Sequence, residues 1–341
     1  MTDRGQTESS SGWRRRWPLI KKLLTGAFFI LVAGLLIGLA RNVDWNEVYR
    51  TLRDYNASTL LMAGTAAVAS YLVYGFYDVL GKHYVQHNLP IRRILPVTLV
   101  CYAFNLNLTA IVGGIALRFR LYSRFGLRAS QITRIFTLSI VTNWVGYIGL
   151  AGLVFALGWI APPAEWDVSE TAMDLLAAGL LLAATVYVLA CGFSKRRNWQ
   201  LRGQEIQLPN VRLALVQLLL GATNWSLMAL VMYFMLSQQA PYPTVLGILL
   251  ISSIAGVIAH IPAGLGVLEA VFVAMLAGTM SKGSVIAGLI GYRVIYFLIP
   301  LLLATLVYLL LEARAKKLRS RGEKRLDSPT PADKEPPRST A

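Results

Sequence analysis

The sequence predicts an all-α polytopic membrane protein with about six full membrane spans and two re-entrant or broken hairpins. Of its 341 residues, 55% are hydrophobic and only 15% are charged, whereas a soluble domain is roughly 25% charged. Eight apolar segments divide the chain, and the long ones can each cross the hydrocarbon core of a bilayer as a helix. Basic residues are concentrated between these segments, as expected where charge sets the topology.

The net charge of +16 does not indicate a nucleic-acid-binding protein. That interpretation requires a basic face on a soluble module, and the high apolar content removes this premise. Nucleic acid is therefore excluded as a partner, and the charge is interpreted as a signal of membrane topology.

The order of the apolar segments gives one transmembrane domain over residues 23–311. Residues 1–22 are polar and end in a basic cluster, which predicts a cytoplasmic tail before an uncleaved first span at 23–40. The other apolar segments lie at 59–80, 95–112, 135–160, 173–193, 213–236, 245–280 and 285–311.

Two further segments are expected at the membrane surface. Residues 42–53 place Val43, Val48 and Leu52 along one face, which predicts an amphipathic helix on the outer surface. Residues 312–341 are expected to form a disordered cytoplasmic tail, because its last part is rich in proline, serine and charge.

Two apolar segments are interrupted. Segment 95–112 carries Asn105 and Asn107 and runs into Gly113 and Gly114, and segment 245–280 is broken around His260, Pro262, Gly264 and Gly266. If 95–112 were a full span, the five arginines of 113–134 would lie outside, against the positive-inside rule. A re-entrant hairpin over 95 to about 117 keeps them inside, because irregular backbone is tolerated at membrane depth where protein buries it. Both termini are then cytoplasmic, and the inside segments hold 28 of the 33 lysines and arginines.

The two halves of the domain, about 23–160 and 173–311, share this layout. Spans begin near 23, 59 and 135 in the first half and near 173, 213 and 285 in the second, and Gly113 and Gly264 are 151 residues apart. The first half begins inside and the second outside, so the pattern predicts an inverted repeat, which is typical of transporters whose site lies near the midplane. The alternative is that many polytopic chains can be divided into similar halves.

Ionisable residues inside the bilayer are functional candidates by default. Here they are Arg118, Glu269, Arg293 and His260. Arg118 and Glu269 are 151 residues apart, so the repeat predicts that they come together as a pair that gates a cavity. The alternatives are a cytoplasmic anchor for Arg118 and a satisfied buried acid for Glu269. Arg293 suits a lipid phosphate, or equally a structural ion pair with Glu269.

The remaining polar candidates have competing interpretations. His260 relays protons or is a satisfied interior group. Asn105 and Asn107 donate to phosphate oxygens or satisfy their own broken backbone. Asp78 is expected to snorkel or to pair with Lys82, four residues later. Several aromatic residues are expected in the interfacial belt or in packing, namely Tyr71, Tyr74, Trp144, Trp159, Trp225 and Tyr292.

No enzyme chemistry is expected. The sequence offers no nucleophile and base pair, no metal cluster and no glycine-rich phosphate loop, so no catalytic residue, metal ligand or cofactor is assigned. Cys101 and Cys191 have no paired spacing and predict neither a disulfide nor a zinc site.

These motifs resemble a known family. The pattern from Asn105 to Arg118, the element Pro262-Ala-Gly264-Leu-Gly266-Val-Leu-Glu269 and the run from Tyr292 to Pro300 look like the lysylphosphatidylglycerol synthase transmembrane-domain family. This family comprises the membrane half of the multiple peptide resistance factor proteins and their stand-alone bacterial inner-membrane relatives. The resemblance covers about residues 20 to 312. Ala110 and Ile111 stand where the family often has a proline, so the first break rests on glycines.

The resemblance implies lipid flipping without aminoacyl transfer, because the chain ends about 30 residues after the last span. We therefore expect a bacterial inner-membrane translocase or transport factor for an anionic or modified phospholipid, such as phosphatidylglycerol, cardiolipin or an aminoacylated derivative. Arg118 and Arg293 would contact phosphate, and Glu269 would balance or gate them. The alternatives are a non-transporting partner that scaffolds a lipid-synthesis enzyme, and an intramembrane lipid-modifying enzyme.

Overall fold

The computed structural model describes residues 44–108, 110–160, 169–194, 198–201, 204–259 and 264–326, with side chains placed up to residue 313. The predicted tail 1–22, the predicted first span 23–40, Val43, His260 and Pro262 lie outside the described residues. The described helices are α2 (Trp45–Arg53), α3 (Ala57–Val85), α4 (Ile91–Asn107), η1 (Ala110–Ala116), α5 (Leu117–Arg124), α6 (Ala129–Ala156), α7 (Glu170–Phe193), α8 (Val211–Met235), α9 (Tyr242–Ile258), α10 (Val267–Leu276), α11 (Lys282–Arg293), η4 (Val294–Leu298) and α12 (Ile299–Leu326).

Five of the described helices are long and apolar enough to cross a membrane. They are α3, α6, α7, α8 and the continuous stretch Lys282–Ala313, which joins α11, η4 and the start of α12. Each coincides with a predicted span. The two short apolar helices, α9 and α10, replace the predicted segment 245–280, which is broken between them. The chain is a helical, multi-pass membrane protein.

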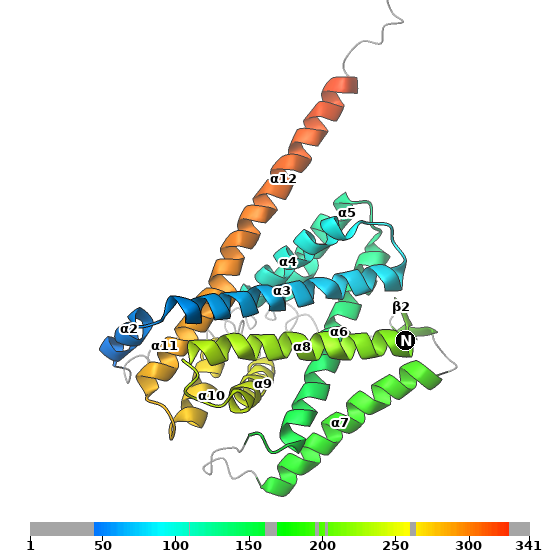
Figure 1. Cartoon of the computed structure of the whole chain (residues 1–341). Coiled ribbons are helices and arrows are strands. Elements are labelled where there is room, and N and C mark those ends of the chain that lie inside the picture. Colours follow the sequence, from blue (N-terminus) through cyan, green and yellow to red (C-terminus); the bar gives the residue numbers. More distant parts are fainter. Residues whose placement is uncertain are drawn as a thin grey trace, which may run out of the picture.

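The centre of the bundle is formed by α3 and α8, which run side by side in opposite directions (Figure 1). Ser70 lies near the middle of α3 and donates a hydrogen bond of 2.8 Å to Oδ1 of Asn224, near the middle of α8. These two residues are 154 residues apart in sequence, the same offset that separates the predicted span starts at 59 and 213. Helix α6 packs on α8 where Gly146 meets the backbone of Gly221, so neither position has room for a side chain.

The first interrupted segment folds back on itself. Helix α4 ends at Asn107, and η1 returns along it, so that Gly113 lies against the backbone of Phe104 and Asn105. A continuous helix would place residues eight positions apart on different turns, about 12 Å from each other. A single continuous helix over 95–112 is therefore excluded. A Cβ atom at Gly113 would overlap that backbone, which explains why the sequence has glycine there.

The predicted surface helix 42–53 forms as α2, capped by the Asp44 carboxylate on the N–H groups of Asn46 and Glu47. Its apolar face packs on this chain: Val48 is buried against Ile286 and Ala287 of α11. The expected amphipathic helix is thus confirmed, but its apolar side is covered by protein.

The structure differs from the sequence expectation in part of the tail, and it adds a detail in one loop. Helix α12 continues to Leu326, so residues 312–326 are helical rather than disordered. Leucine, alanine, lysine, arginine and glutamate dominate this stretch, and all are strong helix formers. The loop between α7 and α8 contains a small antiparallel pair of strands, β1 (Asn198–Leu201) and β2 (Gln204–Gln207), which an all-α prediction does not include.

Candidate functional site

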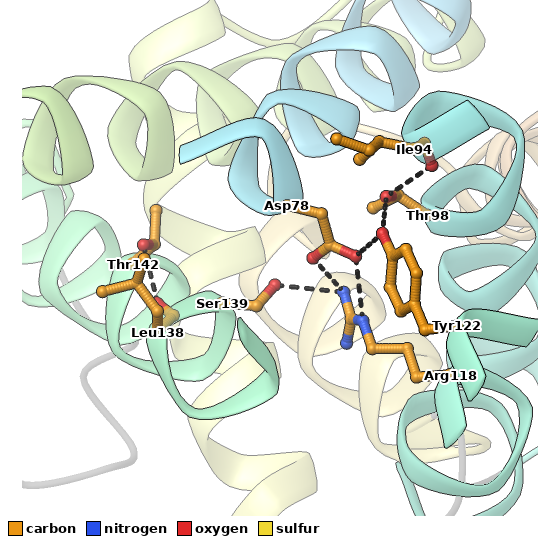
Figure 2. Close-up of polar contacts among 8 residues, drawn as sticks. All are labelled: Asp78, Ile94, Thr98, Arg118, Tyr122, Leu138, Ser139 and Thr142. Atoms are coloured by element: carbon orange, nitrogen blue, oxygen red, sulfur yellow. Dashed lines mark hydrogen bonds and ion pairs between the residues drawn. The ribbon is translucent and has the colours of Figure 1, made fainter. Parts of the chain in front are cut away.

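Arg118 is held in a buried ion pair. Its Nε and Nη2 atoms donate to the two carboxylate oxygens of Asp78 on α3, at 3.1 and 2.8 Å. Nη2 also reaches the hydroxyl of Ser139 on α6 at 3.2 Å, and the Tyr122 hydroxyl donates to the same carboxylate at 2.8 Å. Figure 2 shows these four side chains converging from α3, α5 and α6. The Arg118 and Asp78 side chains are only 1% and 0% exposed.

This geometry corrects two expectations. Arg118 pairs with Asp78 rather than with Glu269, and Asp78 is buried against Arg118 rather than snorkelling or pairing with Lys82. The physical reason is burial. An isolated charge at this depth costs several kcal/mol, and the bidentate fork of Arg118 satisfies both oxygens of Asp78 at once. The pair fastens the first hairpin to α3 and α6.

A second ion pair holds the broken part of the second half. Arg293, the last residue of α11, donates from Nε to Oε1 of Glu269 on α10 at 2.6 Å. The other oxygen of Glu269 accepts the N–H of Gly266 at 2.8 Å. The Arg293 and Glu269 side chains are 17% and 14% exposed, so this pair is partly open to its surroundings. The structural pairing that the sequence left open for these two residues is present.

The glycines of the second break have a conformational role. Gly264 and Gly266 have φ angles of +58° and +83°, which residues with a Cβ atom rarely adopt. They let the chain turn into α10 so that Glu269, in its first turn, bonds back to Gly266. Arg293 Nη2 lies 3.5 Å from the carbonyl oxygen of Gly264 and adds a longer contact to the same turn.

Both hairpins meet one short stretch of the last long helix. Asn107, at the tip of the first hairpin, donates from Nδ2 to the carbonyl of Phe297 at 3.1 Å. The Arg293 guanidinium lies 5.4 Å from the centre of the Phe297 ring. We call the set Asn107, Gly264, Glu269, Arg293 and Phe297 the hairpin junction. The two broken segments, 151 residues apart in sequence, converge there.

The stretch between Arg293 and Ile299 is a π-helix, η4. In an α-helix the carbonyl of Tyr296 would accept the N–H of residue 300, but that residue is a proline and has none. The Tyr71 hydroxyl donates to this carbonyl instead, at 3.1 Å. Single π turns inside longer helices are frequent at functional sites, and this one immediately follows Arg293.

A buried polar cluster joins η4 to the centre of the bundle. The Tyr296 hydroxyl lies 2.6 Å from that of Ser70 and 2.8 Å from that of Tyr102, and Asn224 donates to Tyr102 at 3.3 Å. Tyr74 stacks on Tyr102 with ring centres 3.6 Å apart.

The tyrosines of this region were assigned from the sequence to an interfacial belt or to packing. Tyr71, Tyr74 and Tyr292 are all buried in the core, so packing is the correct alternative. The spacing of Tyr71, Tyr74 and Tyr77 on α3, three residues apart in each case, was the available signal of a shared helix face.

The other candidates are placed as follows. Asn105 is half-buried, with Oδ1 close to Gly114, so it lines the turn of the first hairpin. His260 and Pro262 lie outside the described residues. Among the residues that the structure describes, no group of three His, Cys, Asp or Glu side chains is close enough to hold a metal ion. Cys101 and Cys191 are both buried and are not joined in a disulfide.

Comparison with known proteins shows which family this sequence is similar to. The sequence model of the family described as "Lysylphosphatidylglycerol synthase TM region" matches residues 23–304. The chain is 52% identical over 309 residues to Inner membrane protein YbhN of Escherichia coli (strain K12), which covers 90% of this chain and 97% of that protein. It is 27% identical to Uncharacterized protein slr0712 of Synechocystis, over 90% and 98% of the two chains. It is 21% identical to Phosphatidylglycerol lysyltransferase of Staphylococcus xylosus, over 85% of this chain but only 34% of that protein. The resemblance that the motifs indicated is confirmed.

Proposed function

Because this chain belongs to the lysylphosphatidylglycerol synthase transmembrane-region family, we propose that it moves an anionic or modified phospholipid between the leaflets of a bacterial inner membrane. Phosphatidylglycerol, cardiolipin and an aminoacylated derivative are the substrates that fit. In this proposal the protein performs no aminoacyl transfer and acts through binding and conformational change alone.

The observation that carries the proposal is the convergence of both broken hairpins on one Arg–Glu pair that is not fully enclosed. Arginine binds phosphate through a planar fork of donors. Glu269 accepts a hydrogen bond from the Nε donor of that fork in the present arrangement, and its other oxygen holds the break through Gly266. A lipid phosphate that took the place of Glu269 would release α10 from Arg293 on α11 and would thereby couple binding to movement of the second hairpin.

Arg118 has a different role in this proposal. Its donors are engaged by Asp78 and Ser139 in a cluster closed to the outside. A phosphate could reach it only if that cluster opened, so we assign it to holding the first hairpin in place. Arg293 is then the phosphate-binding residue, and Asn107 positions η4 from the opposite side.

The proposed topology has both termini in the cytoplasm and the two halves related as an inverted repeat. The antiparallel packing of α3 on α8 supports the repeat, as does the bond between Ser70 and Asn224, which occupy equivalent positions in the two halves. In inverted-repeat transporters the broken helices meet near the bilayer midplane, which is where a lipid headgroup would have to pass.

The test is transbilayer movement in reconstituted vesicles. Fluorescent phosphatidylglycerol in the inner leaflet becomes accessible to a membrane-impermeant quencher when the protein moves it. We expect Glu269→Gln combined with Arg293→Gln to abolish the protein-dependent rate, because the double change removes the fork without leaving one charge unpaired. Arg124→Gln combined with Glu312→Gln is the matched control, since it removes another Arg–Glu pair remote from the junction. Equal rates in all three proteins would contradict the proposal.

A second candidate is a membrane partner of a lipid-synthesis enzyme. The alignment with 34% of a phosphatidylglycerol lysyltransferase favours it, because that relative carries this region within a longer chain. This role requires copurification with such an enzyme and lipid movement that does not depend on the protein.

A further inference from the structure

A lateral groove lies between α3, α4, η4 and α12. Its volume is about 730 Å³, within the roughly 300 to 1,000 Å³ typical of sites for small ligands. Val68, Leu72 and Leu303 along it are exposed at the outer surface of the bundle, so it opens sideways. The lining residues are Leu60, Gly64, Ala67, Val68, Tyr71, Leu72, Pro96, Leu99, Val100, Val294, Ile295, Ile299, Pro300, Leu303, Ala304 and Val307.

Small residues and prolines hollow the groove. Gly64 and Ala67 on α3 face Ala304 on α12, and a Cβ atom at Gly64 would meet nothing within 4 Å. Among the described residues that line the groove, Tyr71 alone has a polar side-chain group, and its hydroxyl is already bonded to the Tyr296 carbonyl. The groove therefore presents an almost wholly apolar wall to its occupant.

The groove approaches the hairpin junction along η4. Val294 and Ile295 line the groove, and they directly follow Arg293 in the chain. A cationic group close to an apolar groove complements an amphiphile with an anionic head and a hydrocarbon tail. We propose that this groove holds one acyl chain of a phospholipid whose phosphate reaches Arg293. This inference rests on the proposed function and adds to it the path of the lipid tail.

A large side chain at position 64 is expected to block the groove. Phenylalanine at this position projects into open space, so the fold tolerates it while the groove is filled. Gly179 on α7 is the matched control, because it is also a helical glycine where a Cβ atom would meet nothing within 4 Å, and it is remote from the groove. Gly64→Leu serves as a second, smaller block if Gly64→Phe does not fold.

The experiment is photocrosslinking in vesicles with phosphatidylglycerol that carries a diazirine in one acyl chain, followed by mass spectrometry of the labelled peptides. We expect labelling within 60–72 and 294–307 in the wild type. It should fall roughly tenfold in Gly64→Phe, since a blocked site loses the burial of several methylene groups, and stay unchanged in Gly179→Phe. Equal labelling in the two variants would overturn the inference, because ordinary annular lipid would then explain the signal.

The link to the headgroup is tested with the same probe on phosphatidylcholine. Wild type should label more strongly from phosphatidylglycerol, and the Glu269→Gln/Arg293→Gln double variant should label equally from both. A preference that survives the double variant would overturn the link to Arg293. A disulfide between Gly64→Cys and a cysteine introduced within residues 23–40, together with no lipid label in the wild type, would assign the groove to this chain's own segment and overturn the inference.

The two proposals fail separately. Lipid movement without groove labelling contradicts the groove and leaves the proposed function standing. Groove labelling without lipid movement contradicts translocation and supports the groove as a binding site.

Discussion

The two broken segments of this protein are each held by an ion pair, but the two pairs differ in their burial and in the helices that supply them. Arg118 in the first half is enclosed by Asp78, Tyr122 and Ser139 and is almost unexposed. Glu269, which is 151 residues later, pairs with Arg293 in a setting about one-sixth exposed. The acid that pairs with Arg118 comes from α3, whereas the base that pairs with Glu269 comes from the last long helix.

This difference shows that two similarly broken segments can be held with very different strength. Breaking a fully buried pair leaves a charge that no water can solvate, so the first hairpin is strongly fixed. A partly exposed pair contributes less to stability, and separating its two charges costs less free energy. The pair of Arg118 and Asp78 therefore fixes its hairpin more strongly, and the pair of Glu269 and Arg293 is the one that costs less free energy to separate.

The largest loss of stability should come from removing one partner of the buried pair of Arg118 and Asp78. We expect Arg118→Leu to lower the free energy of unfolding by about 3 to 5 kcal/mol, because Asp78 is left buried and charged. Thermal unfolding in detergent measures it. The double variant Asp78→Asn/Arg118→Gln should recover much of that loss. If the single and double variants unfolded at the same temperature, the unpaired charge of Asp78 would not be the cause of the lost stability.

A smaller loss is expected at the backbone contact of the first hairpin. Gly113→Ala introduces a methyl group into the backbone of α4, which cannot move away as a side chain would. We expect a cost of about 1 to 3 kcal/mol, typical of overpacking, seen as faster proteolysis between α4 and η1. Gly64→Ala is the control and should be neutral or slightly stabilising, since its Cβ meets open space. Equal cleavage would show that the two segments are not closely packed.

The partly exposed pair of Arg293 and Glu269 should matter less for stability than for lipid movement. Arg293→Leu should cost roughly 1 kcal/mol of unfolding free energy, because Glu269 is partly exposed and keeps its bond to Gly266. The same variant should lose protein-dependent lipid movement. A loss of stability as large as that of Arg118→Leu would erase the contrast between the two halves.

The smallest effect is expected at the surface contact between α5 and α12. Arg124 makes two bonds to Glu312, at 2.6 and 2.8 Å, but both residues are solvent-accessible. Exposed pairs of this kind contribute little and are screened by salt. We expect Arg124→Gln to leave the unfolding midpoint unchanged in high salt, and a clear shift there would mean that this contact also fixes the first hairpin.

Much of the fold was accessible from the sequence because hydropathy and charge act locally. The five described spans lie where the apolar segments predicted them, and glycine positions marked both breaks. The contact between Glu269 and Arg293 was foreseeable because each is an isolated charge in an apolar stretch that needs a partner.

The contact between Asp78 and Arg118 was not foreseeable. Lys82, four residues after Asp78 on the same helix, offered a local partner. Only the bonds from Arg118 and Tyr122 of α5 show that Asp78 faces the interior. The same limit applies to η4 and to the cluster around Tyr296. Proline at 300 marked a disturbance in the helix, but the hydroxyl that satisfies the free carbonyl comes from Tyr71, 225 residues away.

The π turn at η4 also sets the angular phase of the last long helix. An α-helix advances by about 100° per residue, and a π turn contains about one residue more than an α turn. If 294–298 were rewound as α-helix with every residue kept, α11 would therefore rotate by about that angle relative to α12, and Arg293 would face away from α10. The wide turn thus takes up one residue of helical phase, so that Arg293 faces α10 while α12 keeps its own contacts.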